Sequence, residues 1–257
     1  MLKIATFNVN SIRQRADIVL EWIVENEPDL IALQELKCEN HNFPQEAFED
    51  AGWTCTVHGQ KAWNGVAFLT REPLDSIAYG FDDPLFPDDR RILSAKIGDI
   101  RVFNTYVPNG SQVGSEKFVY KLRWLERMKA LLAASLSRGE EVIWLGDINI
   151  APTPDDVYNS QKFFGGVGHH PDEFLRLKDI VDLGLVDVFR KHTPGPGHYT
   201  YWDYFITTSL KNNFGWRIDH IYASVGLADR CTVCEIDRGP RFASKPSDHT
   251  VVYAQFE

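Results

Sequence analysis

The chain has few cysteines, and they lack the paired spacing of a complete zinc site. Its four cysteines are Cys38, Cys55, Cys231 and Cys234, and only the last two are close together in the sequence. Those two fall in an expected strand, where positions three apart point to opposite faces. A disulfide-held fold and a zinc finger are therefore not expected, and we predict reduced thiols without a metal.

Long hydrophobic runs and a leader pattern are missing as well. No stretch approaches the roughly 20 apolar residues that a membrane-spanning helix needs. Residues 3–7 read directly as a strand, without the charged, apolar and small-residue order of a signal sequence. These absences predict a cytoplasmic protein with no membrane partner.

An excess of basic residues is the third absence. With 36 acidic and 27 basic residues the formal net charge is −9, which argues against a general nucleic-acid-binding surface, because phosphate contacts usually need excess lysine and arginine. A local basic rim beside an acidic site is compatible with this balance, since a metal-dependent nuclease needs acids. Candidates for such a rim are Lys37, Lys61, Arg71, Arg90, Arg91, Lys117, Lys121 and Arg123.

What is present is an ordinary globular composition. The 257 residues are 44% hydrophobic and 25% charged, which suits one domain spanning residues 1–257 with its own core. Hydrophobic periodicity and capping signals predict helices over residues 15–26, 115–137 and 171–183. Strands are expected over residues 3–9, 29–34, 54–57, 65–70, 92–97, 100–107, 141–145, 217–223, 231–236 and 250–256.

Hairpins and helices are mixed along the chain, without strict alternation of strand and helix. This pattern predicts an α/β protein of the α+β type, with two mainly antiparallel β-sheets packed face to face and helices flanking them. The second half repeats the style of the first. We therefore expect a weak internal pseudo-symmetry, with the functional site in the cleft between the halves.

Four apolar runs each deliver an acid where a buried strand meets a loop. The acids are Glu35, Asp147, Asp219 and Asp248, and the last is followed by His249. Any one of them alone would most simply be a turn former or a helix cap. Carboxylates that converge repel one another unless a cation or a proton intervenes. If the four ends meet, the sequence predicts a site for a hard divalent cation such as Mg²⁺.

Six segments occur in an order and at spacings that together resemble one enzyme family. They are residues 7–13 (FNVNSIR), 33–38 (LQELKC), 104–110 (NTYVPNG), 146–152 (GDINIAP), 215–220 (GWRIDH) and 247–249 (SDH). The chain resembles the exonuclease III family of AP (abasic-site) endonucleases, within the endonuclease/exonuclease/phosphatase superfamily, from residue 3 to residue 256. The resemblance implies a four-layer α/β sandwich.

The resemblance also implies Mg²⁺-dependent hydrolysis of DNA phosphodiesters, with Mn²⁺ as a possible substitute. Family activities are incision at abasic sites, 3′-to-5′ exonuclease action on duplex DNA, and removal of 3′-phosphates or other 3′-blocking groups. The implied partner is double-stranded DNA that carries abasic sites or 3′ ends, bound by a monomer.

Catalytic roles are implied position by position. Asp147 would activate the attacking water, and Asn149 would hold that water or a phosphate oxygen. His249 would donate to the scissile phosphate, with Asp219 fixing its tautomer, and Tyr106 would contact the phosphate or the leaving side. The implied metal ligands are Glu35, Asn8 and Asp248.

DNA contacts and a substrate pocket follow from the same resemblance. Tyr201, Trp216 and Ile218 would line a pocket for a flipped, base-less sugar, although ordinary core packing is an alternative for aromatic residues there. The expected phosphate and DNA contacts are Asn10, Arg13, Lys37, Arg91, Asn109 and Gln112.

The chain departs from the family pattern in places. Asn10 stands where several relatives have Asp, and Gln112 lies close to where some have Arg. Residues 168–174 contain His169 and His170, whose pairing leaves a metal site, a surface role or a phosphate-facing role open. These differences affect the expected grip on abasic DNA and leave the catalytic set intact.

Two other functions compete with a DNA-repair nuclease. The superfamily also contains phosphatases of inositol phosphates and enzymes that cleave phospholipids. A non-catalytic DNA-binding module with the same fold is a third possibility, against which the complete set of catalytic residue types argues.

Overall fold

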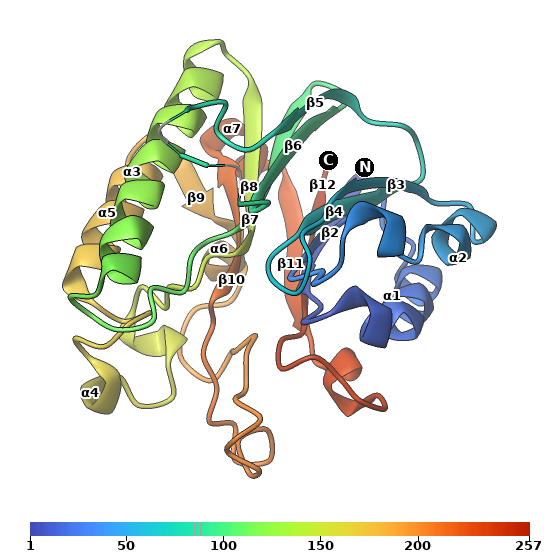
Figure 1. The fold of residues 1–257 in the computed structure, drawn as a ribbon. Helices are drawn as coiled ribbons and strands as arrows, with labels where there is room; N and C mark the ends of the chain where they lie inside the picture. The colour runs from blue at the N-terminus through green and yellow to red at the C-terminus, as the bar shows by residue number, and fades with distance from the viewer. Residues whose placement is uncertain (85, 88) are drawn as a thin grey trace.

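Two six-stranded sheets form the centre of the molecule (Figure 1). The computed structural model describes residues 1–84, 86–87 and 89–257. The first sheet contains, in spatial order, β11 (Cys231–Asp237), β12 (Val251–Phe256), β1 (Leu2–Asn8), β2 (Leu30–Gln34), β4 (Val66–Thr70) and β3 (Thr54–His58). The second contains β5 (Asp75–Tyr79), β6 (Ile92–Ile97), β7 (Ile100–Tyr106), β8 (Glu141–Asp147), β10 (Asp219–Ser224) and β9 (Leu185–Asp187).

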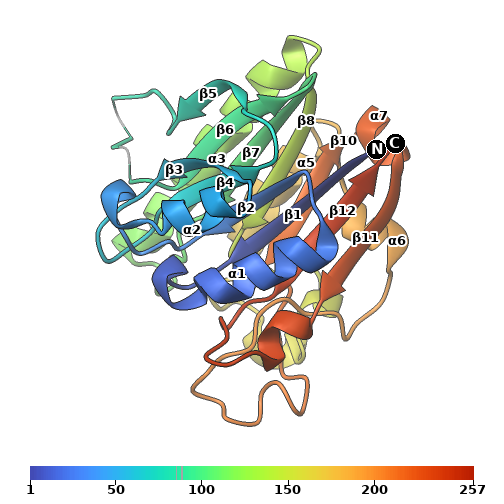
Figure 2. The same cartoon turned by 90° about the vertical axis from the view of Figure 1, so that its right-hand side faces the viewer.

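Helices cover the outer face of each sheet, as Figures 1 and 2 show from two sides. The first sheet carries α1 (Ile12–Asn26) and α2 (Gln45–Asp50), and the second carries α3 (Glu116–Ser137) and α5 (Pro171–Val181). Shorter elements are α4 (Ser160–Phe163), α6 (Val188–His192), α7 (Val225–Asp229) and the 3₁₀ turns η1 (Asn40–Asn42), η2 (Pro154–Asp156) and η3 (Gly239–Phe242). Across the described residues, no helix has the length and apolarity to cross a membrane.

Alternate residues of the strands supply three separate layers of core. Ile4 and Ala32 of the first sheet pack between the sheets with Leu145 of the second. Their strand neighbours Ala5 and Ile31 point the other way, into the layer under α1. Because both faces of each central strand are covered, β2 is buried at every position and reads as a continuous apolar run. The molecule is therefore a four-layer sandwich.

The structure confirms the predicted fold class and sharpens it. Each sheet has one parallel pair, β1–β2 in the first and β7–β8 in the second, and its other strand pairs are antiparallel. Each parallel pair lies at the centre of its sheet and is joined through a helix, α1 or α3. This common plan is the internal pseudo-symmetry that the sequence suggested.

Element boundaries differ from prediction where local signals are weak. Helix α1 begins at Ile12, three residues before the predicted start, and β10 begins at Asp219 instead of residue 217. Ser115 caps α3 as predicted, since its hydroxyl accepts from the Phe118 amide at 3.2 Å. The sequence prediction missed α2, α4, α6, α7, β5 and β9, which are too short to display a period.

The cysteine pair in β11 contradicts the expectation of opposite faces. Cys231 and Cys234 are both buried in the core between the sheets. A β-bulge between Cys231 and Val233 shifts the register by one residue, which turns both thiols to the same side. All four cysteines are free thiols, as predicted.

Candidate active site

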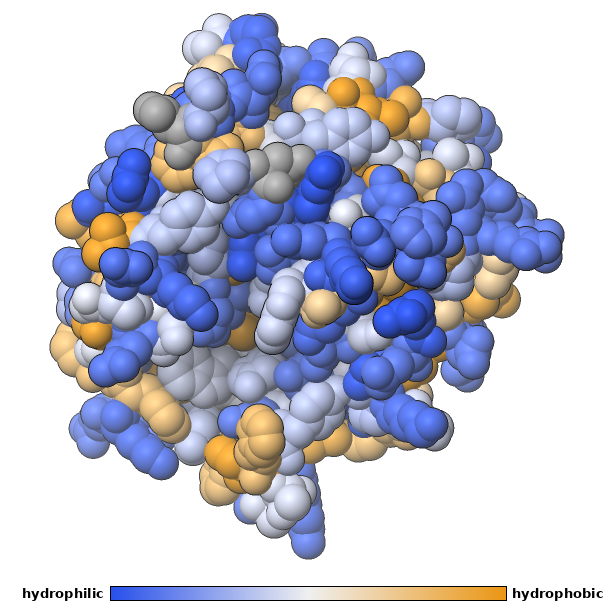
Figure 3. All heavy atoms as spheres, in the orientation of Figure 1, coloured by the Kyte–Doolittle hydropathy of each residue, from blue (hydrophilic) through white to orange (hydrophobic). Residues whose placement is uncertain are grey.

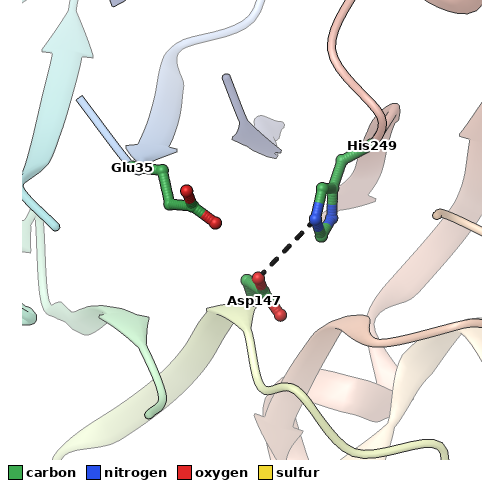
Figure 4. A group of neighbouring side chains, drawn as sticks. All are labelled: Glu35, Asp147 and His249. Carbon is green, nitrogen blue, oxygen red and sulfur yellow. Dashed lines mark ion pairs between the residues drawn. The ribbon is translucent and has the colours of Figure 1, made fainter. Parts of the chain in front are cut away.

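The four acid-bearing strand ends meet at one edge of the two sheets. Glu35 follows β2, Asp147 ends β8, Asp219 begins β10 and His249 precedes β12. Ligand atoms of Glu35, Asp147 and His249 all lie within 4.8 Å of one another. Figure 4 shows these three side chains pointing toward a common centre from separate strands. Segments far apart in the sequence thus form one polar cluster.

Strand register places the members of the second sheet side by side. Tyr106 pairs with Asp147 across β7 and β8, and Asp147 pairs with Asp219 across β8 and β10. Gly146 makes this approach possible, because its φ is +132° and a Cβ there would lie 2.0 Å from the Thr105 carbonyl oxygen. The glycine before Asp147 is therefore required by the close packing of β7 on β8.

Asn8 bridges the two sheets at the bottom of the site. Its Nδ2 donates to Glu35 Oε1 at 2.9 Å and to Asp147 Oδ2 at 2.9 Å, and its Oδ1 accepts from the Asn10 amide at 3.0 Å. The amide thus turns its nitrogen toward the two carboxylates. In this arrangement Asn8 links the acids, in place of the expected oxygen ligand to a cation.

His249 is held by Asp219 behind it. Nδ1 lies 2.8 Å from Asp219 Oδ2, while Nε2 faces Asp147 Oδ2 at 3.8 Å. Burial lowers the pKa of the imidazole, but the carboxylates of Asp219 and Asp147 more than offset this and raise it to about 10. A protonated His249 would present an N–H donor from Nε2 to the site.

The carboxyl groups of Glu35 and Asp147 have pKa values shifted in opposite directions. Burial would raise the pKa of Glu35, yet the Lys37 ammonium at 2.8 Å and the Asn8 amide hold it below the usual range. Asp147 is 1% exposed, and burial raises its pKa, opposed by His249 and reinforced by Asp219 and Glu35. Glu35 is therefore ionised at neutral pH, whereas Asp147 has an unusual affinity for a proton.

The donor set fits a hard divalent cation. Carboxylate oxygens of Glu35 and Asp147 converge beside the Asn8 amide, the His249 imidazole and the Lys37 ammonium, which pairs with Glu35. Oxygen ligands of this kind suit Mg²⁺ or Mn²⁺, which binds few protein carboxylates and keeps other positions for water and phosphate. The site residues are compatible with such an ion.

A cavity of about 420 Å³ opens above this cluster. Its wall is aromatic on one side and acidic on the other. In Figure 3 the lower half of the visible face is hollowed and floored by side chains of intermediate hydropathy. The residues that line the cavity are Glu35, Tyr106, Asn109, Asp147, Asn149, Tyr158, Phe163, Val167, Gly168, Tyr201, Asp203, Ile206, Phe214, Trp216, Ile218, Asp248 and His249.

Most of the expected catalytic and pocket residues reach this cavity. Tyr201, Trp216 and Ile218 all line it. Asn149 also lines the cavity, and its backbone has a left-handed φ. Its side-chain Oδ1 accepts a hydrogen bond from Asn109 Nδ2 at 3.2 Å. The two asparagines thus act as one unit on the side of the site opposite Glu35.

Other expected residues lie at the edge of the site or outside it. Asp248 lines the cavity but lies outside the close cluster, where its Oδ1 accepts from Asn10 Nδ2 at 2.9 Å. Lys37 donates to Asn10 Oδ1 from the rim. Arg91 stacks on the Tyr106 ring at 4.7 Å and donates to the Tyr106 carbonyl. Two more are exposed and do not line the cavity, Arg13 and Gln112.

The sequence prediction placed Lys121 on the exposed basic rim, and this was wrong. Lys121 is fully buried, because it lies on the apolar face of α3 and pairs there with Glu173. Its position among Phe118, Leu125 and Met128, at helical spacing, is the signal that could have revealed this. A lysine within an apolar stripe needs a buried partner.

The adjacent residues His169 and His170 both form hydrogen bonds that hold neighbouring parts of the protein. His169 is buried, with Nδ1 2.7 Å from the Ala151 carbonyl and Nε2 2.8 Å from the Ser160 hydroxyl. His170 is the N-cap of α5 and accepts from the Asp172 amide. His169 is 1% exposed and both of its ring nitrogens contact protein groups, so the surface alternative for His169 is wrong.

Part of the aromatic wall was not predicted. Tyr158 and Phe214 come from loops and Phe163 ends the four-residue helix α4, none of which carries a period, and Tyr158 stacks on Phe214 with ring centroids 4.8 Å apart. A high density of aromatic residues in polar loops was the available signal. Phe205, in the loop before Phe214, is 96% exposed.

Comparison with known proteins places the chain in a family. The model of the Endonuclease/Exonuclease/phosphatase family matches residues 5–249. The chain belongs to this family. Exodeoxyribonuclease III of Haemophilus influenzae is 33% identical over 268 residues, which cover 100% of both chains. The resemblance found in the sequence motifs is therefore confirmed.

Solved structures of the family extend the similarity to the whole fold. An AP endonuclease from Archaeoglobus fulgidus is 43% identical, with a TM-score of 0.95 and 100% of both chains covered. A 3′ phosphatase, NExo from Neisseria bound to a product DNA hairpin, is 35% identical, with a TM-score of 0.96 and the same full coverage. The four-layer sandwich of this chain is the family fold.

Proposed function

We propose that this protein is a Mg²⁺-dependent DNA-repair nuclease that hydrolyses phosphodiesters at abasic sites and at 3′ ends. The observation that carries the proposal is the convergence of Glu35, Asp147 and His249 at the base of an aromatic-walled cavity. Relatives named as an exodeoxyribonuclease, an AP endonuclease and a 3′ phosphatase support it. We further propose that the chain works as one domain and as a monomer.

Glu35 is the proposed principal ligand of the cation, because Lys37 and Asn8 keep its carboxylate ionised. Asp248 and Asn8 are the proposed additional ligands, and Asn8 would first have to turn its amide oxygen toward the ion. A bound Mg²⁺ would neutralise charge on the phosphate and stabilise the departing 3′ oxygen. Mn²⁺ is expected to substitute, since it prefers the same oxygen ligands.

The remaining polar groups supply the proton chemistry. Asp147 is the proposed acceptor of a proton from the attacking water, for which its raised pKa is suited. His249 donates from Nε2 to a phosphate oxygen, and Asp219 keeps Nδ1 engaged so that the imidazole cannot turn away. Asn149, steadied by Asn109, orients the water or a phosphate oxygen, and Tyr106 contacts the phosphate from the neighbouring strand.

Substrate selection is proposed to come from the aromatic wall. Tyr201, Trp216 and Ile218 lie beside the catalytic groups and would enclose a flipped, base-less sugar. Phosphates on either side would meet polar and basic groups on the rim, which compensate locally for the net charge of −9. The proposed rim contacts are Asn10, Arg13, Lys37, Arg91 and Gln112.

Cleavage of three labelled duplexes tests the proposal. One carries an abasic site, one a recessed 3′ end and one a 3′-phosphate. We expect cleavage in Mg²⁺, none in EDTA, and recovery when Mg²⁺ or Mn²⁺ is restored. Release of phosphate from an inositol phosphate without any DNA cleavage would assign the chain to another branch of the superfamily. DNA binding without cleavage would make it a binding module.

A further inference from the structure

The ammonium group of Lys121 is buried and donates hydrogen bonds only to protein atoms. It is 0% exposed, on the inner face of α3. Nζ donates to Glu173 Oε1, to the Asn149 carbonyl at 2.8 Å and to the Asn109 carbonyl at 3.2 Å. An ammonium has three hydrogens to donate, so its hydrogen-bonding capacity is filled. Two of the three acceptors belong to the asparagines that face the catalytic cavity.

Glu173 links Lys121 to a third loop, residues 165–170. It is also 0% exposed, and its Oε2 accepts from the Gly168 amide at 2.8 Å and from the His170 amide at 3.2 Å. Gly168 lines the cavity beside Asn149. The ion pair between α3 and α5 therefore holds the three loop segments 107–111, 148–151 and 165–170, which all border the site.

The backbone after Asp147 is held at three successive carbonyls. Lys121 donates to the first, at Asn149, while His220 Nε2 lies 2.8 Å from the Ile150 carbonyl and His169 Nδ1 lies 2.7 Å from the Ala151 carbonyl. Asn149 itself has a left-handed φ of +54°, which a residue other than glycine adopts only where its surroundings enforce it. The Asn149 side chain itself donates from Nδ2 to the Val107 carbonyl at 2.9 Å. The buried donors to the backbone therefore set its starting point, and the bonds to Val107 and Asn109 set its direction.

Hydrophobic packing alone could join α3 to α5 without any charge. A buried ion pair is often replaceable by apolar side chains of similar volume with no loss of stability. What an apolar pair could not supply is donors to the carbonyls of Asn109 and Asn149, or an acceptor for the Gly168 amide. The best explanation for the Lys121–Glu173 pair is therefore that it supplies hydrogen bonds to the loops that border the site.

We propose that Lys121, paired with Glu173, is a positioning residue of the active site that sets the orientation of Asn109 and Asn149 toward the reacting phosphate. It reaches the chemistry only through these two asparagines. The inference rests on the proposed nuclease function and adds a buried lysine to the groups on which turnover depends.

The decisive variant replaces both partners. In Lys121→Met/Glu173→Met no charge is left unpaired, but the carbonyls of Asn109 and Asn149 and the amides of Gly168 and His170 lose a partner. We therefore expect a melting temperature about 5 to 15 °C below that of the wild type, and the variant is assayed at a temperature where it is folded. Because small displacements of catalytic groups are costly, single-turnover cleavage of abasic DNA should fall about 100-fold, with KM changed less than about threefold. A double variant that cleaves within about threefold of the wild-type rate would overturn the inference.

Lys121→Met/Glu173→Gln, compared with Leu132→Ala, covers the case in which the double methionine variant does not fold. It leaves no buried charge and keeps an acceptor for the Gly168 and His170 amides. Leu132 is buried in the same helix, about 16 Å farther along it, so its truncation removes stability without touching the loops. Both are assayed at a temperature where circular dichroism shows them folded. We expect a wild-type rate per folded molecule for Leu132→Ala and a loss for Lys121→Met/Glu173→Gln. Equal rates in the two would overturn the inference.

Failure of the proposed function gives a different result. In that case the wild-type protein would cleave none of the three DNA duplexes in Mg²⁺. An active wild type with an unaffected rate in the Lys121 variants overturns the positioning role alone.

Discussion

The two sheets of this protein have the same strand arrangement, and each places an acid at the end of a central strand. The electrostatic environments of the two acids differ. In each sheet a central parallel pair joined by a helix ends at a carboxylate, Glu35 after β2 and Asp147 at the end of β8. Lys37 lies 2.8 Å from Glu35, whereas Asp147 has Asp219 as its direct strand neighbour. Against the effect of burial, Lys37 therefore helps to lower the pKa of Glu35, whereas burial, reinforced by Asp219, raises that of Asp147.

This difference shows how one architecture produces two chemical roles. A carboxylate that stays ionised suits a divalent cation, and one that readily takes a proton suits a base. The roles are set by what surrounds each acid, since the strand ends themselves are equivalent. We infer a division of labour in which the first sheet holds the metal and the second handles the proton.

The largest test of this division is Asp147→Asn. Loss of the proton acceptor should reduce single-turnover cleavage about 1,000-fold or more, because general bases contribute up to about 10⁴. The dissociation constant for DNA, measured by fluorescence anisotropy, should change little. Asp229→Asn, an exposed acid at the end of α7, is the control and should be unaffected. An active Asp147→Asn protein would reverse the assignment of roles.

His249→Ala tests the group between the two acids. Removal of the Nε2 donor should slow cleavage by roughly 100- to 1,000-fold, as loss of one preorganised donor does elsewhere. Asp219→Asn should give a smaller loss, because the imidazole remains but its Nδ1 partner changes. Quenched-flow rates on the abasic duplex measure both. A near-normal rate for His249→Ala would remove the histidine from phosphate stabilisation.

Glu35→Gln tests the metal side of the comparison. A neutral amide binds Mg²⁺ more weakly than a carboxylate, so the Mg²⁺ concentration for half-maximal cleavage should rise by about tenfold or more. Saturating metal should restore part of the rate, unlike in Asp147→Asn. Glu235→Gln, an exposed acid on β11, is the matched control. An unchanged Mg²⁺ titration would place the ion elsewhere.

The smallest effect concerns how each half is anchored. In the half built on the second sheet, Arg217 donates to the carboxylates of Asp156 and Asp187 at 2.7 Å each. In the half built on the first sheet, Arg15 donates to the carbonyls of Asn10 and Pro246. Arg217→Met should reduce the free energy of unfolding by about 3 kcal/mol, since it removes the buried cation that Asp156 and Asp187 share and leaves Asp156 with Arg190 as its remaining ion-pair partner. Chemical denaturation measures the loss.

Only one of these anchors should depend on pH. Burial would raise the pKa of both carboxyls, but Arg217 lowers both below their ordinary value. Their stabilisation is therefore complete above the unfolded-state pKa of about 4 and is lost as the pH falls through the lower folded-state values. The deficit of Arg217→Met relative to wild type should shrink below about pH 4, while that of Arg15→Met stays constant. Parallel pH dependences would contradict this.

Most of the fold and most of the site were predictable from sequence. Apolar runs ending in Glu35 and Asp147 reported buried strands and their acids, because burial on both faces leaves a local pattern. The run before Asp219 was wrongly taken for a strand end, since Asp219 begins β10. Six ordered motifs predicted the family, which the family model and the relatives confirmed. Short elements such as α2 and β5 were missed, since a few residues cannot display a period.

What remained hidden depends on distances between residues far apart in the chain. Asn8 bonds to Asp147 across 139 positions, and only that contact shows which atom of its amide faces the acids. The bulge that turns Cys231 and Cys234 to one side, and the pairing that buries Lys121, likewise arise from neighbouring strands and helices.

The sequence by itself determined which residue types arrive at the ends of which strands, because hydrophobic periodicity is a local property. The tertiary structure alone decided what each of those residues does. Charge, burial and hydrogen bonding act through space. Two acids in equivalent positions therefore became a metal-side carboxylate and a proton-side carboxyl only once Lys37 stood beside Glu35 and Asp147 was buried next to Asp219.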